Sequence, residues 1–205
     1  MQNFIIHQNN FLRQNIQAFC HANYVGYREP GNPDYINTLK NTYNNLPNNI
    51  LNNAVRELRA VLLEDLPQIL PAVKLSTLTI CVVPRAKTNY HPNQLLFKTT
   101  VGDVVKKFAG FVDGTDYIVR HTNTRTTHLP PNIPNYNNDG DLPYPGITKD
   151  TCNISNEVRD KNILLIDDLY TRTVNIDEDA IQALLNSGAQ SVIFYAVGKT
   201  VHNEI

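Results

Sequence analysis

Cysteine is scarce in this chain, and long apolar runs are missing. The three cysteines, Cys20, Cys81 and Cys152, lie far apart and form no CxxC pair. Neither a zinc site nor a disulfide framework is therefore expected, and a reducing cytoplasm fits best. No apolar run approaches the roughly 18 to 20 residues that span a bilayer. Because the first residues also lack a basic leader and a cleavage site, we expect no signal peptide and no membrane partner.

The charge shows no strong excess of either sign. The formal net charge is −1 and the isoelectric point is near 6.6. This balance argues against a protein that coats nucleic acid or an anionic membrane, although it permits a local basic site. With 205 residues, of which 41% are hydrophobic, the chain is long enough for one domain with a substantial core and an appendage.

Residues 1–72 are predicted to form a helical N-terminal appendage or hood. The clearest helix is 50–70, where apolar residues recur at steps of three and four and form one stripe. These residues are Leu51, Val55, Leu58, Leu62 and Leu66. This segment could cover a site in the rest of the chain, or it could bind a partner protein.

Residues 73–205 carry the pattern of an α/β core. We expect strands at 75–84, 116–120, 162–166 and 191–197, and helices at 91–108 and 175–187. Strands that alternate with helices predict a mostly parallel sheet flanked by helices. Residues 121–160 are rich in Asn, Thr, Pro and Gly and have little periodicity. A stretch of this length is typical of a functional loop or lid.

One strand, turn and helix in this core carries the functional signal. Ligands of open α/β sheets bind at the carboxyl ends of strands, where Asp167 and Asp168 are expected to lie. Two adjacent carboxylates can accept hydrogen bonds from vicinal hydroxyls or hold Mg²⁺. The turn 171–175 precedes a helix, whose exposed amides can bind phosphate. These are the two ends of a ribose 5-phosphate, although acids in an ordinary turn can also merely cap the helix.

This segment resembles the 5-phosphoribosyl-1-pyrophosphate (PRPP) motif of type I phosphoribosyltransferases. The apolar strand, the two acids and Thr171 match, and Arg172 stands where the amidophosphoribosyltransferase branch also has arginine. The resemblance implies that Asp167 and Asp168 bind the ribose hydroxyls and Mg²⁺. It also implies a PRPP-binding loop, formed by Tyr170, Thr171, Arg172, Thr173, Val174 and Asn175. Thr173 replaces the family's usual glycine, which lets backbone approach a phosphate closely.

Two further basic segments fit the same resemblance. Arg85 and Lys87 follow the first expected strand, where the family contacts pyrophosphate, although they could equally belong to a solvated loop. Residues 119–128 resemble the Arg-rich segment of the competence-type (ComF-like) branch. This implies that Arg120 and Arg125 act in catalysis by contacting the departing pyrophosphate. In the same segment, His121 could donate a proton, as could His128.

If the chain is an enzyme, the resemblance implies transfer of a phosphoribosyl group from PRPP to a nitrogen nucleophile, with Mg²⁺ as cofactor and pyrophosphate released. The protein would act by positioning and by electrostatic stabilisation. Asp167, Asp168, Arg120 and Arg125 are the candidate catalytic residues. One alternative is a non-catalytic regulator that senses PRPP or a nucleotide, and another is an effector of a toxin or defence system. A homodimer is compatible with the family, and the sequence does not indicate the acceptor.

Overall fold

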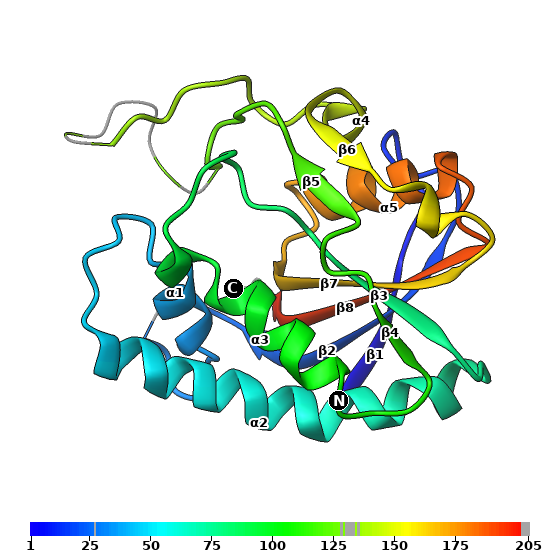
Figure 1. The fold of residues 1–205 in the computed structure, drawn as a ribbon, viewed down its shortest axis with the longest axis horizontal. Coiled ribbons are helices and arrows are strands. Elements are labelled where there is room, and N and C mark those ends of the chain that lie inside the picture. Colours follow the sequence, from blue (N-terminus) through cyan, green and yellow to red (C-terminus); the bar gives the residue numbers. More distant parts are fainter. Residues whose placement is uncertain (27, 128, 130–133, 135, 202–205) are drawn as a thin grey trace.

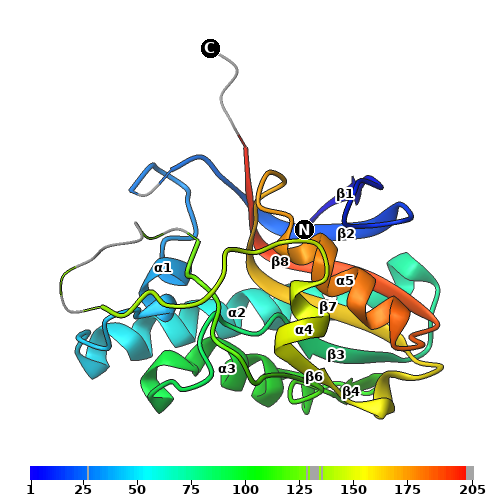
Figure 2. The same cartoon turned by 90° about the horizontal axis from the view of Figure 1, so that it is seen from above.

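A six-stranded sheet forms the centre of the protein. The computed structural model describes residues 1–26, 28–127, 129, 134 and 136–201. The strands of the sheet are β1 (Gln2–Ile6), β2 (Ile16–Tyr24), β3 (Leu78–Val82), β4 (Phe111–Asp113), β7 (Asn162–Tyr170) and β8 (Ser191–Thr200). They follow one another in the order β1-β2-β8-β7-β3-β4 (Figure 2). All neighbours pair in parallel except β1 and β2, which are antiparallel.

Helices cover both faces of this sheet (Figure 1). One face packs against α1 (Tyr35–Lys40), α2 (Asn48–Val73) and α3 (Leu96–Val105), the last preceded by the short helix η1 (Pro92–Gln94). The other face packs against α5 (Ile176–Asn186) and a small antiparallel sheet of β5 (Ile118–Arg120) and β6 (Cys152–Ile154). The central strands β3, β7 and β8 are apolar runs buried on both sides, as parallel-sheet strands usually are. The predicted α/β class with a mostly parallel sheet flanked by helices is therefore confirmed.

The N-terminal segment differs from the predicted helical appendage. Residues 1–24 contain β1 and β2, and β2 pairs with β8 within the main sheet. The helix α2 contributes buried leucines to the same core cluster as β3, β7 and β8. The expected boundary near residue 72 thus divides segments that share one sheet and one core. The apolar stripe predicted the helix, but it could not indicate which surface the helix covers.

Two other expectations are corrected by the strand pairing. The predicted strand at 116–120 is β5, which pairs with β6 outside the main sheet, and the edge of the main sheet is instead the three-residue β4. The stretch 121–160, which was expected to be a loop or lid, contains α4 (Ile147–Thr151), β6 and the short helix η2 (Asn156–Val158). These elements are too short to give a clear periodic signal.

A buried carboxylate joins α2 to the sheet. Asp65 is fully buried, and its Oδ2 accepts a hydrogen bond from the Tyr195 hydroxyl at 2.8 Å and lies 3.0 Å from Nδ1 of His21. Each partner stands on a strand, Tyr195 on β8 and His21 on β2. The carboxylate therefore connects one helix to two neighbouring strands.

Replacing Asp65 by alanine is expected to lower the free energy of unfolding by about 3 kcal/mol, because it leaves two polar side chains without their partner. Urea denaturation followed by circular dichroism would measure the change. Glu64→Ala, at the exposed neighbouring position of α2, is the control and should change stability by less than about 0.5 kcal/mol. Equal effects of the two substitutions would contradict this prediction.

No helix in the described part of the chain is both long and apolar enough to cross a membrane. The three cysteines are buried and unbridged.

Candidate functional site

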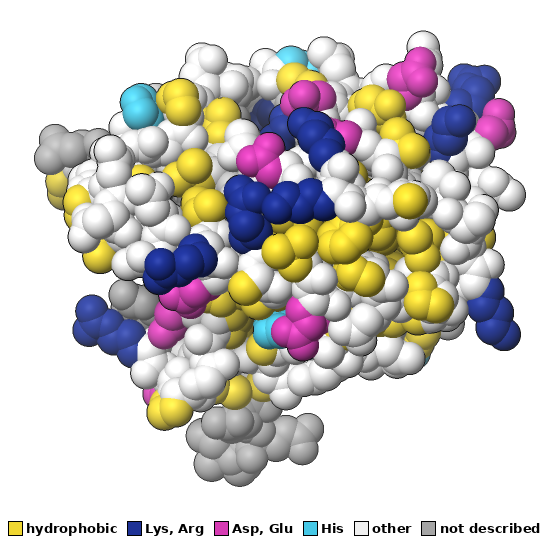
Figure 3. Space-filling view, turned by 60° about the horizontal axis from the view of Figure 1, so that its bottom comes forward, with side chains coloured by type: hydrophobic (Ala, Val, Ile, Leu, Met, Phe, Trp, Pro, Cys, Tyr) yellow, Lys and Arg dark blue, Asp and Glu magenta, His cyan; other side chains and the backbone are white. Residues whose placement is uncertain are grey.

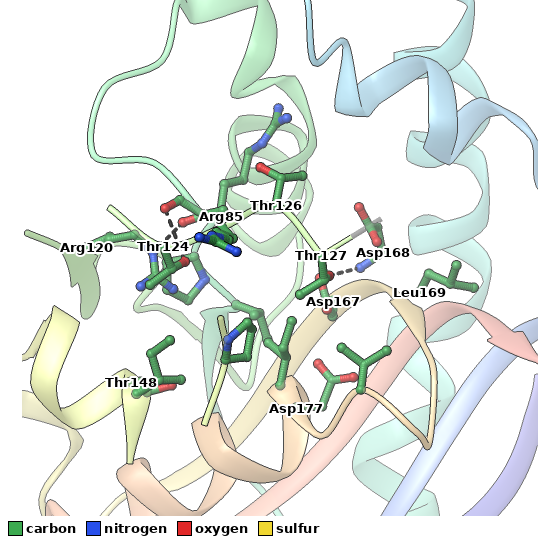
Figure 4. A pocket seen from close by; sticks show the side chains of 18 of the residues that line it. Arg85, Arg120, Thr124, Thr126, Thr127, Thr148, Asp167, Asp168, Leu169 and Asp177 are labelled. Carbon is green, nitrogen blue, oxygen red and sulfur yellow. Dashed lines mark hydrogen bonds between the residues drawn. The ribbon is translucent and has the colours of Figure 1, made fainter. Parts of the chain in front are cut away.

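A cavity of about 370 Å³ lies at the carboxyl ends of β3 and β7. The loop after β3, the end of β7 and the first turn of α5 contribute to its wall. The segment after β5, the helix α4 and the last residue of α1 contribute the rest. Figure 4 shows the acids Asp167, Asp168 and Asp177 at one end of this cavity and Arg85 and Arg120 at the other. The cavity therefore has an acidic end and a basic end.

The acid pair is part of β7, which extends four residues beyond the predicted strand to Tyr170. Residues next to each other on a regular strand point to opposite faces. Here the alternation shifts across the acids, since Ile166 and Leu169 both pack toward the helices α1, α2 and α3. Both Asp167 and Asp168 consequently line the cavity. The Asp168 backbone N–H donates to Oδ1 of Asp167 at 2.8 Å, which orients the first carboxylate.

A third acid, Asp177, stands beside Asp167. It lies in the first turn of α5, is 4% exposed, and its Oδ1 has no hydrogen-bond partner. Its side chain hydrogen-bonds that of Asp167, which requires a proton on one of the two carboxyl groups. Burial, followed by repulsion from Asp168, raises the pKa of Asp167 to about 7. Burial and the charge of Asp167 also raise the pKa of Asp177. The acidic end of the cavity thus holds fewer than three full negative charges near neutral pH.

Lys40 supplies a positive charge to this acidic end. The lysine is the last residue of α1, and its Nζ lies 3.3 Å from Oδ1 of Asp168. Burial alone would lower the pKa of Lys40, but the charges of Asp168 and Asp167 outweigh burial and raise it. The ammonium group therefore stays charged. Sequence reasoning missed this lysine, because it lies far from Asp168 in the chain and carries no local motif.

Three of the four cations predicted to contact pyrophosphate line the cavity. Arg85, Arg120 and Arg125 line it. The Arg120 guanidinium donates to the Arg85 carbonyl and to Oγ1 of Thr151, and burial lowers its pKa. The Arg85 guanidinium donates to the Gln94 carbonyl and lies over the ring of Tyr90. The arginines are therefore held in place by the protein itself.

Lys87, the fourth cation, lines a neighbouring cavity of about 280 Å³. Its Nζ donates to the backbone carbonyl of Asp139 at 2.7 Å and to Oδ1 of the same residue at 2.8 Å. Nearby, the Thr124 backbone N–H donates to the Ala86 carbonyl at 2.8 Å. Lys87 thus fastens the segment after β5 to the loop after β3, and the cavity that it lines shares Arg85, Arg120, Asp167 and Asp168 with the first cavity.

The predicted phosphate loop contributes fewer side chains than expected. Thr171 and Val174 line the cavity, whereas Arg172 and Thr173 are exposed at the tip of a turn closed by the Val174 N–H on the Thr171 carbonyl. Asn175 adopts a left-handed conformation with φ of 58°, which asparagine tolerates better than most residues.

Tyr170 lies in the core rather than on the loop. Its ring packs near Phe4 and Phe194, and its hydroxyl donates to Glu178 at 2.9 Å. Burial raises its pKa. Of the two predicted histidines, His121 is exposed with Nδ1 2.9 Å from Oγ1 of Thr122, and His128 lies outside the described residues.

Asp167 and Asp168 can hold a hard cation such as Mg²⁺ only when a bound ligand supplies further oxygens to it. Among the residues that the structure describes, no three His, Cys, Asp or Glu side chains are grouped so as to hold a metal ion. Mg²⁺ is usually bound by one or two carboxylates, with substrate phosphates and water as its other ligands. Asp167 and Asp168 provide such oxygens in the cavity. They therefore fit Mg²⁺ that arrives with a phosphorylated ligand.

Comparison with known proteins does not assign this chain to a family. No protein-family model matches the chain. A search of curated proteins also finds no significant match.

Proposed function

We propose that this protein binds PRPP with Mg²⁺ and transfers its phosphoribosyl group to a nitrogen nucleophile, releasing pyrophosphate. The observation that carries the proposal is the polarity of the cavity, with Asp167 and Asp168 at one end and Arg85 and Arg120 at the other (Figure 4); Arg125 also lines it. A type I phosphoribosyltransferase fold is part of the proposal, since the acid pair ends a central strand of a mostly parallel sheet.

The acidic end suits the ribose. Carboxylates accept hydrogen bonds from vicinal hydroxyls, and Asp168 lines the cavity beside Lys40. Thr171 and Val174 lie between the acids and the start of α5, where backbone amides can receive a phosphate. In this arrangement the acids would hold the sugar and the turn would hold its 5-phosphate.

The basic end suits the leaving group. Negative charge develops on pyrophosphate as it departs, and fixed cations in a partly enclosed cavity stabilise such charge. Arg125 keeps donors for this purpose, since its described side-chain bond is a single one from Nε to the Gly140 carbonyl at 2.9 Å. Residues 124–127 would exclude water, which limits hydrolysis of the activated sugar.

The distribution of charge on the face drawn in Figure 3 does not favour a nucleic-acid partner there. On the face drawn in Figure 3, Lys and Arg side chains are interspersed with Asp and Glu side chains. Proteins that bind nucleic acid generally gather basic residues on one face or along one helix.

A non-catalytic sensor of PRPP is the second candidate. The observation that favours it is that the guanidinium groups of Arg85 and Arg120 already donate to protein oxygens. Fewer donors then remain for a departing pyrophosphate. In such a protein PRPP would bind without turnover.

Isothermal titration with PRPP and Mg²⁺ tests the binding that both functions share, and we expect saturable binding of one ligand per chain. Pyrophosphate release in the presence of a panel of nitrogenous bases then separates the two. Release supports the transferase, and binding without release supports the sensor. The absence of any binding heat, confirmed by an unchanged melting temperature with PRPP, would rule out both.

A further inference from the structure

The helix α1 brings Lys40 to the acidic end of the cavity, beside Asp168. Its buried residues Ile36 and Leu39 belong to the core cluster on that face of the sheet. The helix ends at Asn41, which is left-handed and whose N–H bonds the Thr38 carbonyl. The backbone at Lys40 is therefore fixed by core packing before it and by the helix end after it. The direction of its side chain follows from the packing of α1.

The acidic end of the cavity creates an electrostatic problem for a phosphorylated ligand. Asp167, Asp168 and Asp177 all line it, and a phosphate that approaches them is repelled. Within the described part of the chain, the ion pair made by these acids is the one between Asp168 and Lys40. Both side chains are about one quarter exposed, at 23% and 22%, so solvent screens this pair only in part.

We infer that Lys40 is a positioning residue for the sugar-phosphate ligand. Its ammonium group holds the Asp168 carboxylate toward the cavity. The same positive charge reduces the repulsion between the acids and an incoming phosphate. The inference rests on the proposed function, since it assigns Lys40 to the same ligand. It also gives a role to the N-terminal segment, which contributes a cavity residue as well as two strands of the sheet.

A purely structural ion pair would behave differently. Partly exposed pairs contribute little to stability, and their loss does not change the binding of a ligand elsewhere. Lys106 offers a matched comparison, because its Nζ also lies 3.3 Å from an aspartate oxygen, that of Asp113, but outside the cavity. Lys106 is 66% exposed and Lys40 22%, so the comparison matches the ion-pair distance and the loss of one lysine charge, but not the burial.

The experiment is titration of ribose 5-phosphate into the wild-type protein and three variants. Lys40→Met is expected to weaken binding by about tenfold or more, because one charge of a partly buried pair at the site is left unpaired. Lys40→Arg, which keeps the charge, is expected to restore affinity to within about threefold of wild type. Lys106→Met should bind as the wild type does. The melting temperature of Lys40→Met should stay well above the temperature of the titration, since a partly exposed ion pair contributes little to stability.

The possible outcomes separate this inference from the proposed function. Equal affinity of wild type and Lys40→Met would overturn the role of Lys40 and leave the function standing. So would a loss of affinity in Lys40→Arg as large as that in Lys40→Met. Binding of ribose 5-phosphate without binding of PRPP would overturn the transferase and sensor proposals alone. If the wild type binds neither ligand, both the function and the inference are wrong.

Discussion

Asp168→Asn is expected to weaken PRPP binding by about a hundredfold. Asparagine presents one acceptor oxygen in place of two and carries no charge, so the charge-assisted hydrogen bonds to the ribose hydroxyls are lost. Such bonds are worth about 1.5 to 3 kcal/mol each, which corresponds to factors of about 10 to 100. The substitution also leaves the ammonium of Lys40 without the carboxylate that lies 3.3 Å away. Titration with PRPP and excess Mg²⁺ measures the change.

Asp116→Asn is the matched control for this prediction. Asp116 also pairs with a lysine, Lys98, but its side chain is 84% exposed and outside the cavity. The Asp116→Asn variant should bind PRPP with the affinity of the wild type. If Asp168→Asn retains wild-type affinity while its melting temperature is also unchanged, the acid pair does not bind the sugar. If both variants lose binding together, the effect is one of overall charge and not of the site.

Stability is expected to fall as the pH rises from about 4 to 7, and Asp177→Asn should reduce this dependence. The pKa of Asp167 is raised from an ordinary value of 3.8 to about 7, and that of Asp177 is raised as well. A carboxyl group with a raised pKa in the folded protein contributes stability at low pH. This stability is lost as the pH rises through the folded-state pKa. The unfolded chain binds fewer protons than the folded protein in this range.

The variant should differ from the wild type mainly at high pH. An asparagine at position 177 can donate a hydrogen bond to Asp167 without adding a negative charge. We expect it to raise the free energy of unfolding by about 2 kcal/mol at pH 8, with little change at pH 4, since one pKa unit corresponds to about 1.4 kcal/mol. Urea denaturation at several pH values checks this expectation.

Two other acids change the stability with pH in the opposite direction, but in a different pH range. The pKa of Asp113 is lowered, against the effect of burial, by hydrogen bonds from Thr115 and Lys106, and that of Asp139 by the hydrogen bond from Lys87. Their contributions are lost only as the pH falls below about 4. The slope above pH 4 therefore reports on the buried acids. If the free energies of unfolding of the wild type and of Asp177→Asn change with pH in parallel, the assignment of this slope to the buried acids is wrong.

The sequence by itself determined the central strands, the main helices and the position of the acid pair. Continuous apolar runs at 162–166 and 191–197 identify strands buried on both faces, and the apolar stripe at 50–70 identifies α2. These signals are local, because periodicity is set by the geometry of a single element. The acid pair could be placed at the end of a strand for the same reason.

Only the tertiary structure decided which residues share the cavity. Lys40 meets Asp168 because α1 packs against the same face of the sheet, and Asp177 meets Asp167 because the turn 171–175 folds α5 back against β7. Lys87 pairs with Asp139 and lines a neighbouring cavity that shares both acids with the first one. Strands β1 and β2 likewise depend on pairing with partners distant in the chain. Contacts between distant residues follow from how layers pack, and no periodicity in one element records them.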